Sequence, residues 1–123
     1  MFSTVVQASG LGAAETVIAT TPPINISLPN QPIILFWYCF IGGGTAITSV
    51  NFKLRRGTTT AGVQINSGQS NDTSVTTGNV IRSGFYVDIP GEIAGQQYSL
   101  TLQCVGNTGS ETVADVCILA MQL

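Results

Sequence analysis

The 123-residue sequence contains no histidine and only four basic residues. Histidine is the most common general base and metal ligand in proteins, so its absence excludes a Ser-His-Asp triad and a cysteine–histidine catalytic pair. The four basic and six acidic residues give a net charge of −2. Because nucleic-acid binding depends on neutralising many phosphates, we predict no nucleic-acid partner.

Long apolar runs are also missing. No stretch approaches the roughly 18 apolar residues of a membrane-spanning helix. Residues 1–15 lack the basic segment with which a secretion signal begins. We therefore expect no membrane partner, and synthesis in a reducing cytosol.

The three cysteines are Cys39, Cys104 and Cys117, and no two of them have the CxxC spacing of zinc and redox sites. Free cysteine is among the most buried residue types, so we predict three buried thiols within strands. A disulfide between Cys104 and Cys117 stays open, because sequence spacing alone does not establish one.

The acidic residues form no clear catalytic or metal-binding pattern. Asp88 and Glu92 flank a turn and could approach each other as a glycosidase pair does, but carboxylates in turns usually cap the backbone or face solvent. Residues 71–73 (Asn-Asp-Thr) are the one small cluster of oxygen ligands, and an ordinary polar turn explains them better. We predict no enzyme activity, no catalytic residue, no cofactor and no metal.

Apolar residues are abundant. They make up 44% of the chain, while charged residues make up 8%, against about 25% in a typical soluble domain. Soluble domains usually keep roughly 25–35% of their surface charged. We interpret the shortage of charge as a sign that copies of the chain, or a partner, cover much of the surface.

Alternating apolar and polar residues, interrupted by Gly, Pro, Asn and Ser, predict short strands and no helix. The predicted strands are 4–9, 15–20, 24–28, 33–41, 47–56, 62–65, 74–77, 81–89, 97–105 and 113–121. This pattern predicts an all-β fold, a jelly-roll-like antiparallel β-sandwich of about 8–10 short strands. One domain spans residues 1–123, and residues 1–20 are candidates for an extended segment that contacts neighbouring molecules.

Two predicted strands, 33–41 and 113–121, are apolar at nearly every position. A strand of this kind is usually covered on both faces. We therefore predict that these strands line an interface between copies of the chain. The predicted interface residues are Ile33, Leu35, Trp37, Val116, Ile118 and Leu119.

The charges inside strands allow further predictions. Three of the four cations, Lys53, Arg55 and Arg56, lie within four residues, which indicates either a solvated strand face or a docking patch for an acidic partner. Asp115 lies either at a wet strand edge or buried beside a cation, for which Arg82 and Arg56 are the candidates.

The alternation along the predicted strand 81–89 assigns its side chains to an inner and an outer face. We place Phe85, Val87 and Ile89 inside, and Tyr86 and Asp88 outside. On that outer face Tyr86 would be a platform for a sugar ring, the residue type that a carbohydrate-binding module needs.

Two stretches, 53–62 (KLRRGTTTAG) and 88–103 (DIPGEIAGQQYSLTLQ), together with the TTPP at 20–23 and the apolar last strand, resemble small jelly-roll head decoration (cement) proteins of tailed phages. The resemblance implies a homotrimer over the three-fold points of an icosahedral shell. It implies the major capsid protein as partner and the outer capsid surface as location, after synthesis in the host cytoplasm. It implies no catalytic residue.

Two other functions fit a jelly roll. The first is a receptor-binding or fibre-head knob, whose recognition tip would be the polar loop 66–79. The second is a non-catalytic carbohydrate-binding module.

Overall fold

The computed structural model describes residues 2–44, 49–66, 70–72, 78–105 and 111–123. The regular elements within these residues are all β-strands. In chain order they are β1 (Phe2–Leu11), β2 (Thr16–Thr20), β3 (Ile24–Ile26), β4 (Ile33–Gly44), β5 (Ser49–Arg56), β6 (Ser70–Asp72), β7 (Gly78–Asp88), β8 (Ile93–Gln96), β9 (Tyr98–Val105) and β10 (Glu111–Gln122).

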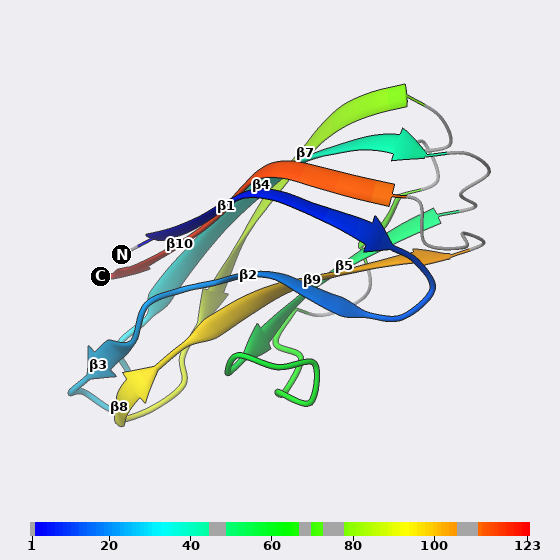
Figure 1. Ribbon diagram of the computed structural model, residues 1–123. Helices are drawn as coiled ribbons and strands as arrows, with labels where there is room; N and C mark the ends of the chain where they lie inside the picture. Colours follow the sequence, from blue (N-terminus) through cyan, green and yellow to red (C-terminus); the bar gives the residue numbers. More distant parts are fainter. Residues whose placement is uncertain (1, 45–48, 67–69, 73–77, 106–110) are drawn as a thin grey trace.

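Eight of these strands form two facing sheets (Figure 1). Sheet A has the order β1-β10-β4-β7, sheet B has the order β2-β9-β5-β6, and β3 pairs with β8 in a short ribbon. All neighbouring strands are antiparallel. The chain passes repeatedly from one sheet to the other, which is the topology of a jelly roll. The predicted fold class is confirmed.

The core lies between the sheets and follows from the alternation of side chains along each strand. Every second residue of the apolar strands β4 and β10 points inward. The same holds for β5 and β9 of sheet B. The inward residues are Ile33, Leu35, Cys39 and Ile41 of β4, Val116, Ile118 and Ala120 of β10, Val50, Phe52 and Leu54 of β5, and Leu100, Leu102 and Cys104 of β9.

Some predicted boundaries differ from the structure. Residues 2–20 form β1 and β2, the edge strands of sheets A and B, and so belong to the sandwich itself. The expected turn before β9 contains the short strand β8. The predicted strand 74–77 lies outside the described residues, and the edge strand next to β5 is β6.

The predicted inside and outside of β7 were wrong. Phe85 and Val87 point outward and are exposed, as is Ile89 just after the strand, whereas Asp88 is buried and Tyr86 packs against the core. Burial of Asp88 is possible because Arg56 and Tyr98 supply hydrogen bonds to its carboxylate. The alternation along the strand was predicted correctly, but the two faces were exchanged: the side predicted to face the core faces outward.

All three cysteines are free thiols. Cys39 and Cys104 are buried, as predicted, while Cys117 is only half-buried because it points to the outer side of sheet A. Burial raises the pKa of the Cys39 thiol to about 12. The open question of a Cys104–Cys117 disulfide is thus answered, since neither sulfur is bonded.

Candidate functional site: the outer face of sheet A

The outer face of sheet A carries rows of apolar side chains across three strands. The backbone register aligns Met121, Ile34 and Val87 in one row, Leu119, Phe36 and Phe85 in the next, and Cys117, Tyr38 and Ser83 in the third; Phe40 and Ile81 begin a fourth. Each row runs from β10 through β4 to β7. We call these residues the apolar face.

The apolar face is open to solvent in a single copy of the chain. Phe85 is 69% exposed and Ile81 66%, both on the edge strand β7, and Phe36 and Tyr38 on β4 are 43% and 44% exposed. The rings of Phe36 and Phe85 lie 6.0 Å apart between centroids. Three strands with four same-side positions cover roughly 400 Å², a size at which an apolar patch on a monomer is often functional.

A hollow of about 470 Å³ opens on the apolar face. It forms where the two small residues Ser83 and Cys117 flank Tyr38 on either side. The lining residues are Phe36, Trp37, Tyr38, Ser83, Gly84, Phe85, Cys117 and Leu119. Apart from the hydroxyl groups of Tyr38 and Ser83, the side chains of this hollow offer little for hydrogen bonding.

Trp37 supports the sheet from below the hollow. Its indole packs against the Phe52 ring of sheet B at 4.7 Å between centroids. Its cross-strand neighbour is Gly84, where an added Cβ would lie only 2.8 Å from the indole Nε1. The absence of a side chain at Gly84 therefore leaves the space that the indole fills between the sheets.

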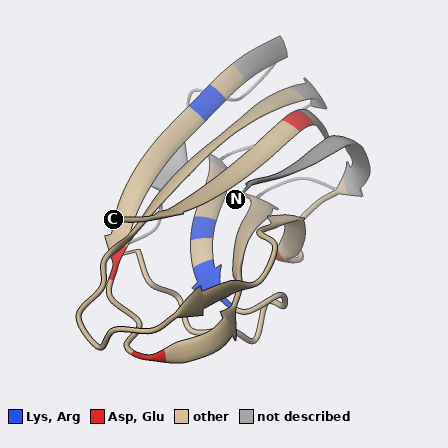
Figure 2. Cartoon of the chain, turned by 90° about the vertical axis from the view of Figure 1, so that its left-hand side faces the viewer, with Lys and Arg blue, Asp and Glu red and all other residues tan. Residues whose placement is uncertain are grey.

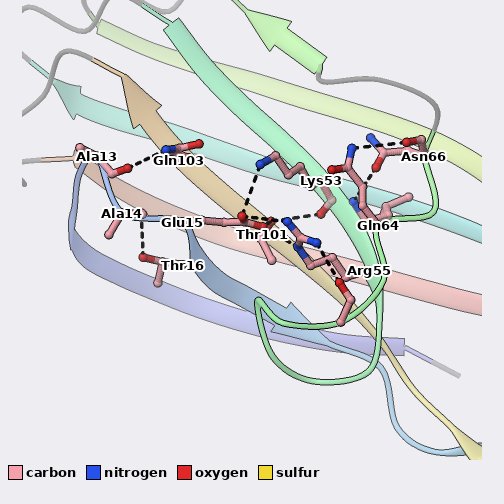
Figure 3. A network of polar contacts seen from close by, with 12 residues as sticks. Ala13, Ala14, Glu15, Thr16, Lys53, Arg55, Gln64, Asn66, Thr101 and Gln103 are labelled. Carbon is pink, nitrogen blue, oxygen red and sulfur yellow. Dashed lines mark hydrogen bonds and ion pairs between the residues drawn. The ribbon is translucent and has the colours of Figure 1, made fainter.

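The opposite side of the sandwich, the outer face of sheet B, is polar instead. There Glu15 accepts hydrogen bonds from Arg55 Nε at 2.7 Å, from Arg55 Nη2 at 2.9 Å and from Lys53 Nζ at 3.3 Å (Figure 3). The hydroxyl of Thr101 donates to the same carboxylate at 2.6 Å. These contacts lower the pKa of Glu15 to about 2, with the Arg55 hydrogen bond as the main cause.

A second ion pair lies between the two sheets. Arg56 of β5 holds the Asp88 carboxylate of β7 through Nε and Nη2, and the Tyr98 hydroxyl of β9 donates to the same carboxylate at 2.9 Å. Burial, followed by the charge of Asp88, raises the pKa of the Tyr98 hydroxyl. Tyr98 therefore remains a neutral donor to Asp88.

The ion pairs of Lys53, Arg55 and Arg56 thus lie away from the apolar face, whereas Arg82 belongs to β7 and Asp115 to β10. Figure 2 shows the few charged residues among those described, with two cationic segments close together on one strand. The side chains that we assign to the apolar face include no Asp, Glu, Lys or Arg. Asp115 is exposed at the bulge of β10, at the margin of this face. Of the two alternatives for Asp115, exposure to solvent is correct, although β10 is an inner strand of sheet A and not an edge strand.

The predicted interface residues occupy different positions from those expected. Ile33, Leu35, Val116 and Ile118 are fully buried in the core of one copy, and Trp37 packs against that core. Only Leu119 points to the outer face. Both predicted strands contribute to the apolar face, but the prediction named the inward half of each strand, because a fully apolar strand does not reveal which side meets the opposite sheet.

The predicted docking patch is not a free cationic surface. Lys53 and Arg55 are paired with Glu15, and Arg56 is paired with Asp88. Their partners, 32 to 40 residues away in the sequence, could not be identified without the sheet register. These three cations stabilise the sandwich of one copy.

The predicted sugar platform and carboxylate pair do not form such sites among the described residues. Tyr86 is half-buried against the core and is not the outward platform expected for a sugar. The Asp88 carboxylate is held by Arg56, and Glu92 is exposed. The side chains at 71–73 lie outside what the structure describes. Elsewhere in the described part of the chain, no three His, Cys, Asp or Glu residues gather as metal ligands would.

Sequence reasoning missed the residues that are most exposed on the apolar face, Phe36, Tyr38, Ile81, Phe85 and Val87. The signal was present in the alternation of β7, where the apolar set and the set containing Asp88 occupy opposite sides. If the buried partner of Asp88 had been recognised, the alternation would have predicted that the apolar residues of β7 face outward. Among the residues described, no helix has the length and apolar character needed to cross a bilayer.

Comparison with known proteins shows the fold alone. No family model and no curated protein matches the sequence. Part of dimeric latent PorU from Porphyromonas gingivalis matches 96% of this chain with a TM-score of 0.58 and 13% identity, and this chain spans 11% of that protein. A protein in the structure of infectious bursal disease virus, Gx strain, matches 100% of this chain with a TM-score of 0.51 and 11% identity, and this chain spans 32% of it.

A third solved structure, a carbohydrate-binding module described as CBM4, matches 95% of this chain at a TM-score of 0.48 and 8% identity, and this chain spans 81% of it. The likeness to the first two structures, at TM-scores of 0.58 and 0.51, shows a shared fold and leaves the function to be argued from the residues.

Proposed function

We propose that this protein is a structural virion protein, a homotrimeric capsid decoration (cement) protein that stabilises an icosahedral phage head. The observation that carries the proposal is the apolar face of sheet A, which is exposed in a single copy and has no charge. A face of this kind is typical of a protein that works in contact with other protein. Nothing on it resembles a catalytic arrangement.

The strength of such a contact suits a repetitive assembly. Burying roughly 400 Å² at about 25 cal/mol per Å² gives on the order of 10 kcal/mol per copy before costs. The loss of rigid-body freedom removes about 4–15 kcal/mol of this. One pairwise contact is therefore marginal, whereas a closed ring in which each copy is held by two neighbours is more stable.

The fold supports this role without deciding it. Jelly rolls are common in viral shells, and one of the similar folds comes from the structure of a virus. Within the proposal, the major capsid protein is the partner, the outer capsid surface is the location, and synthesis takes place in the host cytoplasm.

The apolar face also favours one alternative in a limited way. Exposed Phe36, Tyr38 and Phe85 could stack on sugar rings, as in a carbohydrate-binding module. Sugar recognition also needs several hydrogen-bonding groups, and the hollow supplies mainly the hydroxyls of Tyr38 and Ser83. The third function, a receptor-binding or fibre-head knob, would place recognition in the loop 66–79, most of which lies outside the described residues.

Binding to empty capsid shells tests the proposal. The purified protein is expected to co-sediment with shells of its source particle, at a ratio that matches the three-fold sites, and to raise the melting temperature of the shell. A protein that stays in the supernatant would contradict the proposal. Binding to host cells with no effect on shell stability would favour the knob. Binding to a glycan array that is lost in Tyr38→Ala would favour the carbohydrate-binding module.

A further inference from the structure

We propose that the apolar face is covered by a second copy of this chain, with the Phe85 ring of one copy seated in the hollow beside Tyr38 and Cys117 of the next. This inference deepens the proposed function, on which its biological setting rests, by naming the partner of the face. It concerns the contact between copies and not the contact with a capsid.

The shape of the apolar face is complementary to itself. Phe85 and Ile81 on β7 are its most exposed side chains and form a ridge along the edge of sheet A. The hollow is lined from all three strands, with Phe85 on its β7 side and the half-exposed Leu119 and Cys117 on its β10 side. Two strand spacings, about 10 Å, separate β7 from β10. The ridge and the β10 side of the hollow therefore lie on opposite halves of one face.

The size of the hollow fits the proposed occupant. About 470 Å³ is more than a phenyl ring requires, so the ring of Phe85 can enter together with part of a neighbouring ridge residue such as Ile81. The rings of Phe36 and Tyr38 border the hollow. An aromatic ring that enters such a site gains contact with other aromatic rings beyond the burial of its area.

The charge distribution favours a second copy over a charged partner. The side chains that define the apolar face carry no charge, and the exposed Asp115 lies at the margin of the face. Lys53 and Arg55 are held by Glu15 on the far side of the sandwich, and Arg56 is held between the sheets. Two copies can thus approach through this face with little repulsion between like charges.

A ridge and a hollow on opposite halves of one face can give a contact that joins unlike surfaces. Contacts of this type close into a ring when the rotation between neighbours is a whole fraction of a turn. At 120° each copy inserts its ridge into one neighbour and receives the ridge of the other, which is the arrangement required by the proposed homotrimer.

Two matched variants test the contact on purified protein. Phe85→Glu places a charge on the ridge, and Val63→Glu places the same charge at an equally exposed apolar residue outside the apolar face, since the two side chains are 69% and 67% exposed. Light scattering should give Phe85→Glu the 12.8 kDa mass of one chain, and Val63→Glu the mass of the wild-type assembly. Circular dichroism should show both variants folded.

Cys117 provides a second readout that does not depend on mass. It lines the hollow, whereas Cys39 and Cys104 are buried in the core. In the wild-type assembly a maleimide should react slowly with Cys117, and Phe85→Glu should raise that rate at least tenfold. The Cys117→Ala variant should abolish the added reactivity, which shows that the core thiols do not contribute.

The outcomes separate this inference from the proposed function. An assembly that persists in Phe85→Glu, or a wild-type chain that is monomeric with a freely reactive Cys117, overturns the contact. A monomer that still binds shells overturns the contact and keeps the decoration role. An intact assembly that does not bind shells keeps the contact and overturns the decoration role. A dimer that Phe85→Glu dissociates supports the contact and contradicts the homotrimer.

Discussion

Arg56 of β5 and Asp88 of β7 form a two-point ion pair that joins the two sheets of the sandwich. Arg56 Nε donates to Asp88 Oδ2 at 2.9 Å, and Nη2 donates to Oδ1 at 2.7 Å. Tyr98 of β9 completes the arrangement by donating its hydroxyl to Oδ2. Because these strands belong to different sheets, the group fixes the position of one layer on the other.

Removing the carboxylate should destabilise the fold. Asp88→Ala leaves Arg56 and Tyr98 without their shared acceptor, and breaking a buried pair costs about 3–5 kcal/mol. The Arg56 side chain is 34% exposed and can be partly rehydrated, so we expect the free energy of unfolding to fall by about 2–3 kcal/mol. Urea denaturation measures this. The control Glu92→Ala, at an exposed carboxylate, should change it by less than about 0.5 kcal/mol, and an equal loss in both variants would contradict the account.

Gly84 should tolerate no side chain while Trp37 is present. A Cβ at Gly84 would lie 2.8 Å from the indole Nε1, and the indole is held by Phe52 on its other side. We expect Gly84→Ala to lower the free energy of unfolding by about 1–3 kcal/mol through overpacking. The neighbouring control Ser83→Ala, on the outer face, should be close to neutral.

A double mutant distinguishes this steric cause from a general loss of stability. In the background Trp37→Leu, Gly84→Ala should cost clearly less than it does in the wild type, because the atoms that it would meet are gone. Equal costs in the two backgrounds would show that the indole is not what excludes the side chain.

Glu15 should make stability depend on pH in the acid range. Its pKa is lowered from 4.5 in the unfolded chain to about 2 in the fold. The stabilisation is therefore fully present above about pH 4.5 and is lost as the pH falls toward 2. After allowance for solvent screening we expect a loss of about 1–2 kcal/mol.

The comparison of wild type with Glu15→Gln isolates this effect. Urea denaturation from pH 5 to pH 2 should show a steeper fall for the wild type than for the variant. The two curves should converge at the acid end, where Glu15 is protonated. Curves that stay parallel would mean that Glu15 gains nothing from Arg55 and Lys53.

Asp115 should be replaceable by glycine but not by alanine. Its φ of 50° lies in the left-handed region, at the bulge where two residues of β10, Asp115 and Val116, face one residue of β4. This conformation costs a residue with a Cβ roughly 1–2 kcal/mol, and aspartate tolerates it better than alanine does. We expect Asp115→Gly to be neutral or slightly stabilising and Asp115→Ala to lose about 1 kcal/mol by thermal unfolding. The reverse order would show that the carboxylate, not the backbone, matters here.

The sequence was sufficient for the fold class but not for the sidedness of its strands. Alternation in β5 and β9, with turn residues between them, predicted a sandwich because the period of side chains is a local property. Which side faces the core depends on the partner sheet. For β4 and β10 both sides are apolar, so Ile33 and Phe36 look alike in sequence although one is buried and the other exposed.

The polar groups account for the remaining errors. Asp88 was placed outside because a lone carboxylate is costly to bury, and the rule fails where Arg56 and Tyr98 approach from the opposite sheet. Lys53 and Arg55 looked like a docking patch because their partner Glu15 lies across two strands. Long-range pairing of this kind is fixed by strand register, and local sequence patterns do not contain it.

The central claim is that copies of the chain cover one another through the apolar face of sheet A. Sedimentation equilibrium of the wild-type chain alone, at micromolar concentration, measures this most directly. The account predicts a mass three times 12.8 kDa, about 38 kDa, that does not change on moderate dilution. A single species of 12.8 kDa across the whole concentration range would contradict it.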